Sequence, residues 1–97
     1  MQQYAIRRRN AWASPEELQA AGARSTVVGE EMPDDVRWIR TYALAEADGT
    51  LGSVCIYQAV SPEAIREHAR RVGMPADEIT QVAEVLVVRP DPEPVSA

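Results

Sequence analysis

Four stretches of the chain combine β-branched and aromatic residues with alternating hydrophobic and polar positions, at residues 4–9, 36–45, 52–59 and 79–88. This pattern is typical of β-strands, whose successive side chains point to opposite faces of a sheet. In the first stretch it places Tyr4, Ile6 and Arg8 on one face and Arg7 and Arg9 on the other. The sequence therefore predicts four strands.

Two further segments are predicted to be helical, and each begins with Ser-Pro-Glu, at residues 14–16 and 61–63. Serine is a favoured helix N-cap, and proline fits the first helical position. Glu17 stands three residues after Ser14, which completes a capping box. We expect the first helix to end at Gly29 and the second at Gly73.

The second helix has a clear apolar stripe. Its members follow the i, i+3, i+4, i+7 spacing that lines one helix face: Ile65, His68, Ala69 and Val72. His68 is therefore expected on the side that faces the sheet.

Each half of the chain reads strand, helix, Met-Pro turn, strand, and Asp48-Gly49 supplies a tight hairpin between the halves. This order predicts an α+β ferredoxin-like βαββαβ sandwich, with a four-stranded antiparallel sheet in the order 4-1-3-2 and two helices on one face. Residues 1–89 should form the single domain. Residues 90–97, where proline alternates with acidic residues, should form a disordered tail.

Composition excludes two classes of partner. The formal net charge is −5 and the chain has no Phe, so it lacks the basic face and base-stacking aromatics of a nucleic-acid-binding protein. No apolar stretch approaches the roughly 20 residues that span a bilayer, so we expect no membrane partner. The first residues lack a leader pattern and Cys55 is the one cysteine, which predicts a cytoplasmic protein.

Arginines are concentrated in two predicted strands. Arg7, Arg8 and Arg9 are consecutive in a strand that this fold places inside the sheet, and Arg37 and Arg40 lie in the second strand. A buried guanidinium needs a partner. We expect carboxylates to pair with the arginines of the first strand. The alternative is a small anionic ligand bound by Arg7, Arg9, Arg37 and Arg40.

The second strand carries apolar groups on both faces. Strict alternation places Trp38, Arg40 and Tyr42 on one face and Ile39 and Thr41 on the other. Two helices cover only one face, so the other favours a homodimer formed through the sheet.

His68 is the chain's one histidine and a candidate metal ligand, general base or hydrogen-bonded core residue. One imidazole alone holds no metal ion, so a metal site needs Cys55, a carboxylate such as Asp77 or Glu78, or a second subunit. Cys55 with His68 is also a conceivable nucleophile and base pair.

A longer pattern resembles a known family. Residues 55–61, Cys-Ile-Tyr-Gln-Ala-Val-Ser, are followed by His68, Gly73, Pro75, Asp77, Ile79 and Val82. This pattern resembles the small bacterial proteins catalogued as domain of unknown function 4242, one of which is described as nickel-binding. The resemblance implies a ferredoxin-like protomer that dimerises through its sheet and a site for nickel or another divalent metal.

Two functions follow as hypotheses. The first is a small homodimeric binding protein with a divalent metal near His68, held with Cys55 and Asp77. The second is a small dimeric enzyme, similar to ferredoxin-like isomerases or monooxygenases, with His68 as base and an arginine on an anionic substrate. A closed apolar pocket with His68 facing an arginine favours the enzyme, whereas His68 near the surface beside Cys55 or acidic residues favours the metal.

Overall fold

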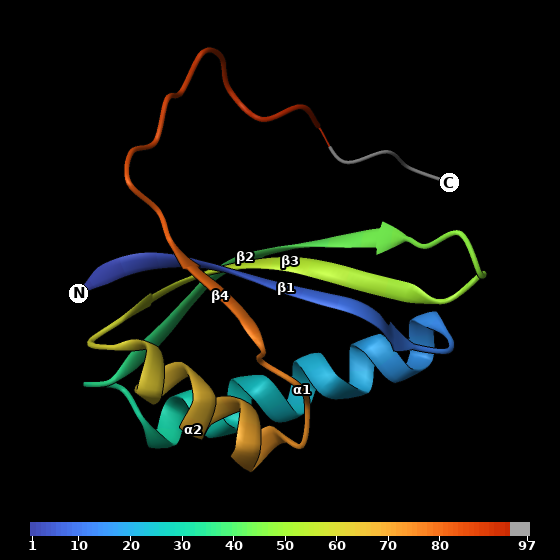
Figure 1. The fold of residues 1–97 in the computed structure, drawn as a ribbon, viewed down its shortest axis with the longest axis horizontal. Coiled ribbons are helices and arrows are strands. Elements are labelled where there is room, and N and C mark those ends of the chain that lie inside the picture. Colours follow the sequence, from blue (N-terminus) through green and yellow to red (C-terminus); the bar gives the residue numbers. More distant parts are fainter. Residues whose placement is uncertain (94–97) are drawn as a thin grey trace.

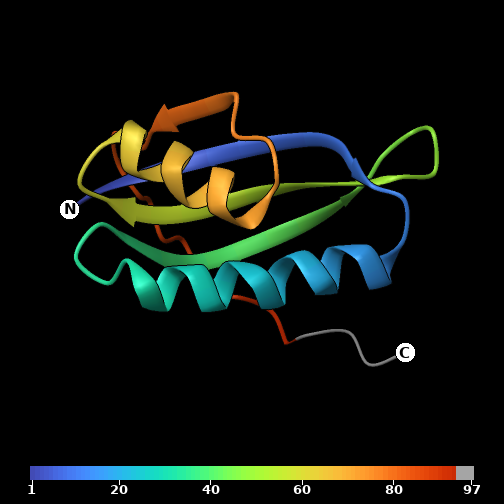
Figure 2. The same ribbon diagram turned by 90° about the horizontal axis from the view of Figure 1, so that it is seen from below.

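The computed structural model describes residues 1–93, which form four strands and two helices: β1 (Gln2–Trp12), α1 (Pro15–Glu31), β2 (Val36–Ala45), β3 (Leu51–Ala59), α2 (Pro62–Val72) and β4 (Glu78–Gln81). The strands pair antiparallel in the order β2-β3-β1-β4. Both helices lie on one face of the sheet (Figure 1; Figure 2). The α+β ferredoxin-like fold and the sheet order predicted from the sequence are confirmed.

The helix starts agree with the predicted caps. Ser14 Oγ accepts a hydrogen bond from the Glu17 amide at 3.2 Å, and Ser61 Oγ accepts one from the Ala64 amide at 3.1 Å. The predicted end of α2 at Gly73 is also correct, since Gly73 has a left-handed φ of 89°.

The predicted end of α1 at Gly29 is wrong, because the helix continues to Glu31 with Met32 as its C-cap. Met32 precedes Pro33, and a proline ring disfavours helical geometry in the residue before it. The Met-Pro pair therefore ends this helix, and Gly29 remains inside it.

β2 contains a bulge at Ile39. Trp38 pairs with Tyr57 and Arg40 pairs with the adjacent Ile56, so Ile39 has no partner on β3. The bulge reverses the alternation of the strand: Trp38 and Thr41 share the helix-facing side, whereas Arg40 lies on the open side. The predicted grouping of Trp38 with Arg40 and Tyr42 is therefore wrong.

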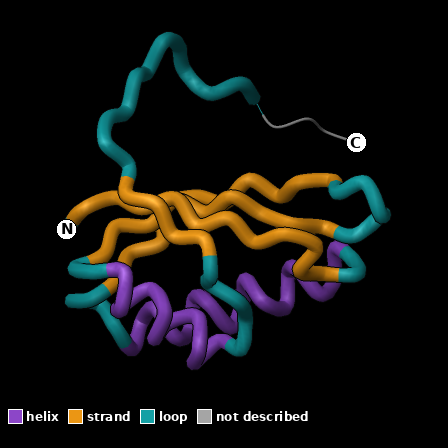
Figure 3. The backbone as a smooth tube through the Cα atoms, in the orientation of Figure 1, coloured by secondary structure: helices purple, strands orange, loops and turns teal. Residues whose placement is uncertain are grey.

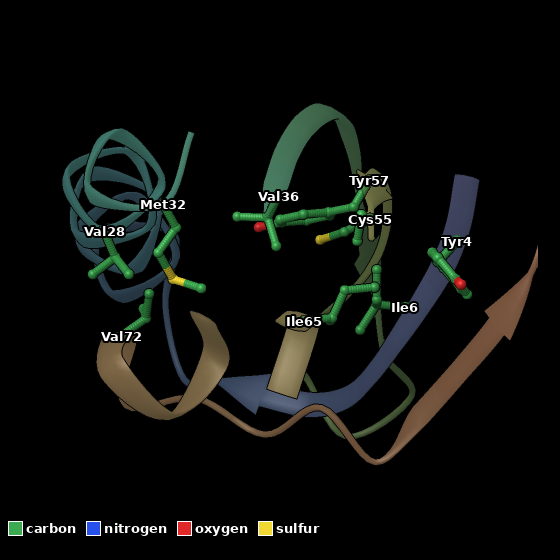
Figure 4. Packing of buried hydrophobic residues seen from close by; sticks show 10 residues of the cluster. Tyr4, Ile6, Val28, Met32, Val36, Cys55, Tyr57, Ile65 and Val72 are labelled. Atoms are coloured by element: carbon green, nitrogen blue, oxygen red, sulfur yellow. The ribbon is translucent and has the colours of Figure 1, made fainter. Parts of the chain in front are cut away.

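The core lies between the helices and one face of the sheet (Figure 4). Tyr4 and Ile6 from β1 pair directly with Tyr57 and Cys55 from β3, and Ile65 of α2 packs against this group. Burying a side chain of this size contributes about 1.5–3 kcal/mol. The core thus fixes which residues of β1 and β3 face the helices.

β4 is shorter than the predicted strand at residues 79–88. Its pairing with β1 ends where the Val82 amide donates to the Gln3 carbonyl, at the start of β1. The chain then crosses the sheet face opposite the helices (Figure 3), and Asp91 forms an ion pair of 2.8 Å with Arg40. Residues 94–97 of the predicted tail lie outside the described residues. No helix within residues 1–93 is long and apolar enough to cross a membrane.

Candidate functional site

A pocket of about 280 Å³ lies between α1 and the helix-facing side of the sheet. Its polar groups come from Arg8, Gln19, Ser25, Thr41 and Cys55, and its apolar walls come mainly from Trp12, Leu18, Ala21, Trp38, Tyr57 and Met74. Gln19 and Trp38 are exposed, so the pocket opens to solvent between α1 and β2.

The β2 bulge forms one wall of this pocket. It places the Trp38 ring over Tyr57, with the ring centroids 6.3 Å apart and the planes inclined by 14°. Trp38 Nε1 donates to Thr41 Oγ1 at 2.8 Å, and Thr41 Oγ1 in turn donates to Cys55 Sγ at 3.1 Å. A chain of hydrogen bonds therefore joins Trp38, through Thr41, to the buried thiol of Cys55.

Arg8 is the buried cation of the site, with 2 % of its surface exposed. Its Nε donates to the Pro75 carbonyl at 2.6 Å and its Nη1 donates to Cys55 Sγ at 3.3 Å. Nη2 is buried and has no hydrogen-bond partner among the described residues. An unsatisfied donor of a buried charge is costly in an apolar environment, which makes this atom the unusual feature of the pocket.

The predicted carboxylate partners are present for two of the three arginines of β1. Arg7 pairs with Glu46 at 3.1 Å and Arg9 pairs with Glu78 at 2.8 Å. For Arg8 the prediction is wrong, since no carboxylate within residues 1–93 pairs with it. The alternation of side chains along β1 places Arg8 on the side that faces the helices. There it donates to the Pro75 carbonyl and to Cys55 Sγ instead of to a carboxylate.

The four arginines predicted to bind an anion have separate partners. Besides the two pairs of β1, Arg37 Nη1 donates to Gln58 Oε1 at 3.5 Å, and Arg40 Nη1 donates to Tyr42 Oη at 3.1 Å and to Asp91. The hydrogen bond to Glu78 raises the pKa of Arg9. The hydrogen bonds to Tyr42 and, next in size, to Asp91 raise the pKa of Arg40. None of the four lines the pocket.

His68 lies in the core beside the pocket but does not line it. It is 1 % exposed, and its Nε2 donates to the Ser25 carbonyl at 3.1 Å. Nδ1 has no partner among the described residues. Burial lowers the pKa of His68, the Ser25 bond opposes that effect, and the Arg8 charge adds to it. Burial therefore favours the neutral imidazole. Its ring meets the Tyr57 ring edge-on, with the centroids 5.5 Å apart.

The three predicted metal ligands do not form a metal site in one chain. Within residues 1–93 no group of three or more His, Cys, Asp or Glu side chains is arranged to hold an ion. Asp77 is exposed, whereas His68 is buried with Nε2 bonded to a carbonyl. Cys55 Sγ accepts hydrogen bonds from Arg8 and Thr41. These residues do not fit a resident nickel ion within one subunit.

Sequence reasoning did not assign Arg8, Trp38 or Thr41 to a functional site. The signal for Arg8 was present, because alternation already grouped it with Tyr4 and Ile6, the buried face of β1. Trp38 and Thr41 carried no such signal, since their orientation depends on the bulge at Ile39.

Comparison with known proteins identifies a family and related solved structures. A family model described as nickel responsive protein SCO4226-like matches residues 4–82. The crystal structure of SCO4226 from Streptomyces coelicolor A3(2) superposes with a TM-score of 0.68 and 21% identity, covering 87% of this chain and 99% of that chain. That identity shows a shared fold. The name expected from the sequence, domain of unknown function 4242, is not the description that this family model carries. No curated protein matches the chain.

Proposed function

Because this chain belongs to the SCO4226-like family of nickel responsive proteins, whose description assigns no reaction, we propose from its geometry that it is a small binding protein. Its ligand occupies the pocket between α1 and the sheet. The ligand has an apolar body and one anionic group, which contacts Arg8. The observation that carries this proposal is the buried, unpartnered Nη2 of Arg8 in a mainly apolar pocket.

The size of the pocket limits the ligand. A cavity of about 150 Å³ in another protein accepts benzene, so 280 Å³ suits a single ring or a short branched chain that bears a carboxylate. Guanidinium binds carboxylates through charge-assisted hydrogen bonds. The ligand class is therefore a small aromatic or branched aliphatic acid.

The position of His68 favours binding over the isomerase-like or monooxygenase-like alternative. That alternative needs His68 in the pocket as a base, facing an arginine. The pocket and the arginine are present, but His68 does not line the pocket and is hydrogen-bonded to the Ser25 carbonyl. The arrangement thus supports recognition of an anion without a histidine base.

A homodimer formed through the open sheet face is the assembly we propose. Ile39 and Tyr42 are 46% and 52% exposed there, and Val85, Leu86, Val87 and Val88 of the crossing segment are 58–84% exposed. Exposed apolar groups in such number favour association. We also place the protein in the cytoplasm, where its lone thiol stays reduced.

Nickel, or another divalent metal, is our second proposed ligand, and the family description supports it. One chain does not bring His68, Cys55 and Asp77 together. Nickel binding would therefore require ligands from a second copy.

The acid-binding proposal is tested by calorimetry with phenylacetate and its neutral isostere phenylacetamide. We expect the acid to bind more tightly than the amide. Charge-assisted hydrogen bonds contribute about 1.5–3 kcal/mol, so Arg8→Met should weaken acid binding by roughly 10-fold or more. Replacing a buried charge with an apolar side chain is often well tolerated, which makes this variant usable.

Arg37→Met is the matched control, because it removes an exposed arginine that does not line the pocket. It should leave acid binding unchanged. Equal binding of acid and amide, or equal affinity of wild type and Arg8→Met, would show that Arg8 does not recognise the ligand.

A further inference from the structure

Cys55 is the one cysteine of the chain, and its Sγ lies in the pocket wall with two donors directed at it. Thr41 Oγ1 already accepts from Trp38 Nε1, so its own proton points to Sγ, 3.1 Å away. Arg8 Nη1 donates to the same sulfur at 3.3 Å. Figure 4 shows the sulfur projecting from β3 into the space between sheet and helices. Sγ itself donates to Ser53 Oγ at 3.6 Å. The thiolate is the reactive form of a cysteine, and neighbouring cations and donors favour it.

The second observation is the free Nη2 of Arg8. It belongs to the same planar guanidinium as Nη1, the atom that donates to the sulfur. It is buried and has no partner among the described residues. A donor in this position can receive negative charge that develops next to Cys55. Such preorganised donors stabilise transition states in which charge moves to a leaving atom.

We propose that Cys55 is a reactive thiol that reduces organic hydroperoxides, with Thr41 and Arg8 holding the sulfur and Arg8 Nη2 receiving the departing oxygen. The Cys55 thiolate attacks one peroxide oxygen, and a sulfur–oxygen bond forms as the oxygen–oxygen bond breaks. The bonding electron pair leaves with the other oxygen as an alkoxide. The alkoxide takes up the proton lost by the thiol and becomes an alcohol.

The step balances without a further reactant. Sulfur is oxidised by two electrons to a sulfenic acid, and the hydroperoxide is reduced to an alcohol. The apolar walls favour a hydroperoxide with a small hydrocarbon group over hydrogen peroxide. The chain has no second cysteine, so the sulfenic acid forms no intrachain disulfide. An external thiol is needed to restore Cys55, which suits a sensor better than a rapidly cycling peroxidase.

This inference shares the pocket with the proposed acid site but does not depend on acid binding. Its test therefore contains no carboxylate ligand. Reduced wild-type protein is mixed with tert-butyl hydroperoxide, and sulfenic acid is measured over time by intact mass with dimedone trapping. The same protein unfolded in urea provides the rate of an unassisted cysteine.

Each donor is tested by removing it. We expect native Cys55 to react at least about 10-fold faster than the unfolded chain, with Thr41→Val and Arg8→Met each lowering the rate by roughly 5- to 10-fold. Arg8→Lys should restore part of the rate, because it keeps the charge but not the planar fork. Thr26→Val is the matched control, since Thr26 is exposed and bonded to the Gly22 carbonyl.

Two results would overturn the proposal: a native rate no faster than that of the unfolded chain, or a rate insensitive to both Thr41→Val and Arg8→Met. Cys55→Ser separates the two functions of the pocket. This variant should lose dimedone labelling and keep phenylacetate binding. If the wild-type protein binds phenylacetate but Cys55 does not react with the hydroperoxide, only the thiol proposal fails. If Cys55 reacts but phenylacetate does not bind, only the acid-binding proposal fails.

Discussion

Nε2 of His68 in α2 donates a hydrogen bond to the backbone carbonyl of Ser25 in α1, across 3.1 Å. Ser25 also lines the pocket, and its Oγ donates to the Ala21 carbonyl at 2.8 Å. One buried imidazole therefore connects the two helices directly behind the pocket. His68 acts through this contact as a support for the pocket wall.

Removing that support should destabilise the fold. We expect His68→Ala to lower the free energy of unfolding by about 1–3 kcal/mol, because a buried hydrogen bond and its packing are lost. Urea denaturation monitored by circular dichroism measures the change. Arg66→Ala, at an exposed position of the same helix, should change stability little. Equal stability of His68→Ala and wild type would mean that the bond contributes nothing.

The same residue predicts a pH dependence. Burial keeps the pKa of His68 below its ordinary value of 6.5 in the folded state. As the pH falls below about 6.5, His68 therefore takes up a proton more readily in the unfolded chain than in the folded protein. The free energy of unfolding decreases as a result. Above that pH the contribution is fully present. Unfolding curves between pH 5 and 7.5 should show this slope in wild type and not in His68→Ala.

A separate acidic limb belongs to Glu67, whose pKa the hydrogen bonds from Arg70 and Arg71 lower to about 2. The stabilisation that this carboxylate contributes is lost only as the pH falls below about 4.5. It therefore does not overlap the pH range in which His68 changes the stability. A wild-type stability that stays flat from pH 7.5 to 5 would contradict the assignment of a neutral, buried His68.

Ligand binding should be visible in tryptophan fluorescence. Both tryptophans, Trp12 and Trp38, line the pocket, so phenylacetate should change their emission with the affinity found by calorimetry. Trp38→Phe should remove most of the change if the ligand lies against the β2 wall. An emission spectrum that is unchanged at saturating acid would place the ligand elsewhere.

The proposed dimer predicts a face-specific response to charge. Tyr42→Glu introduces a charge on the open sheet face and should shift the protein to a folded monomer in sedimentation velocity. Val27→Glu is the control, since Val27 is 58% exposed on α1 and lies on the other side of the molecule. A wild-type protein that sediments as a folded monomer at micromolar concentration would refute the dimer.

Nickel binding should follow the dimer. In calorimetry with protein free of an affinity tag, we expect wild type to bind nickel and the Tyr42→Glu monomer to show much weaker binding, because one chain lacks a ligand set. His68→Ala should retain binding, since the imidazole is buried on the helix-covered side of the sheet, away from the proposed dimer face. Loss of binding in His68→Ala, with full binding by the monomer, would place the metal at His68 within one chain.

The sequence predicted the features that depend on local chemistry. Ser14 and Ser61 mark the helix starts, Gly73 marks one helix end, and the alternation of Tyr4, Ile6 and Arg8 gives the buried face of β1. The predicted sheet order followed from the hairpin and the repeated strand–helix–strand order.

Features that depend on pairing across the sheet were not predictable in this way. The bulge at Ile39 is defined only by its register with β3. Simple alternation, which ignores it, places Trp38 and Thr41 on opposite faces of the sheet. The partner of Arg8 depends on where the Pro75 carbonyl lies after the second helix. Both are non-local relationships, which a single sequence does not display.

The extra residue in β2 has a consequence for the shape of the molecule. Trp38 and Arg40 pair with neighbouring residues of β3, so a chain without Ile39 would still place each later side chain on its present face. What Ile39 adds is local twist. Its deletion should flatten the edge of the sheet and draw the indole back from the mouth of the pocket. The one extra residue in β2 should thus affect how wide the mouth of the pocket is, without changing which residues line the pocket.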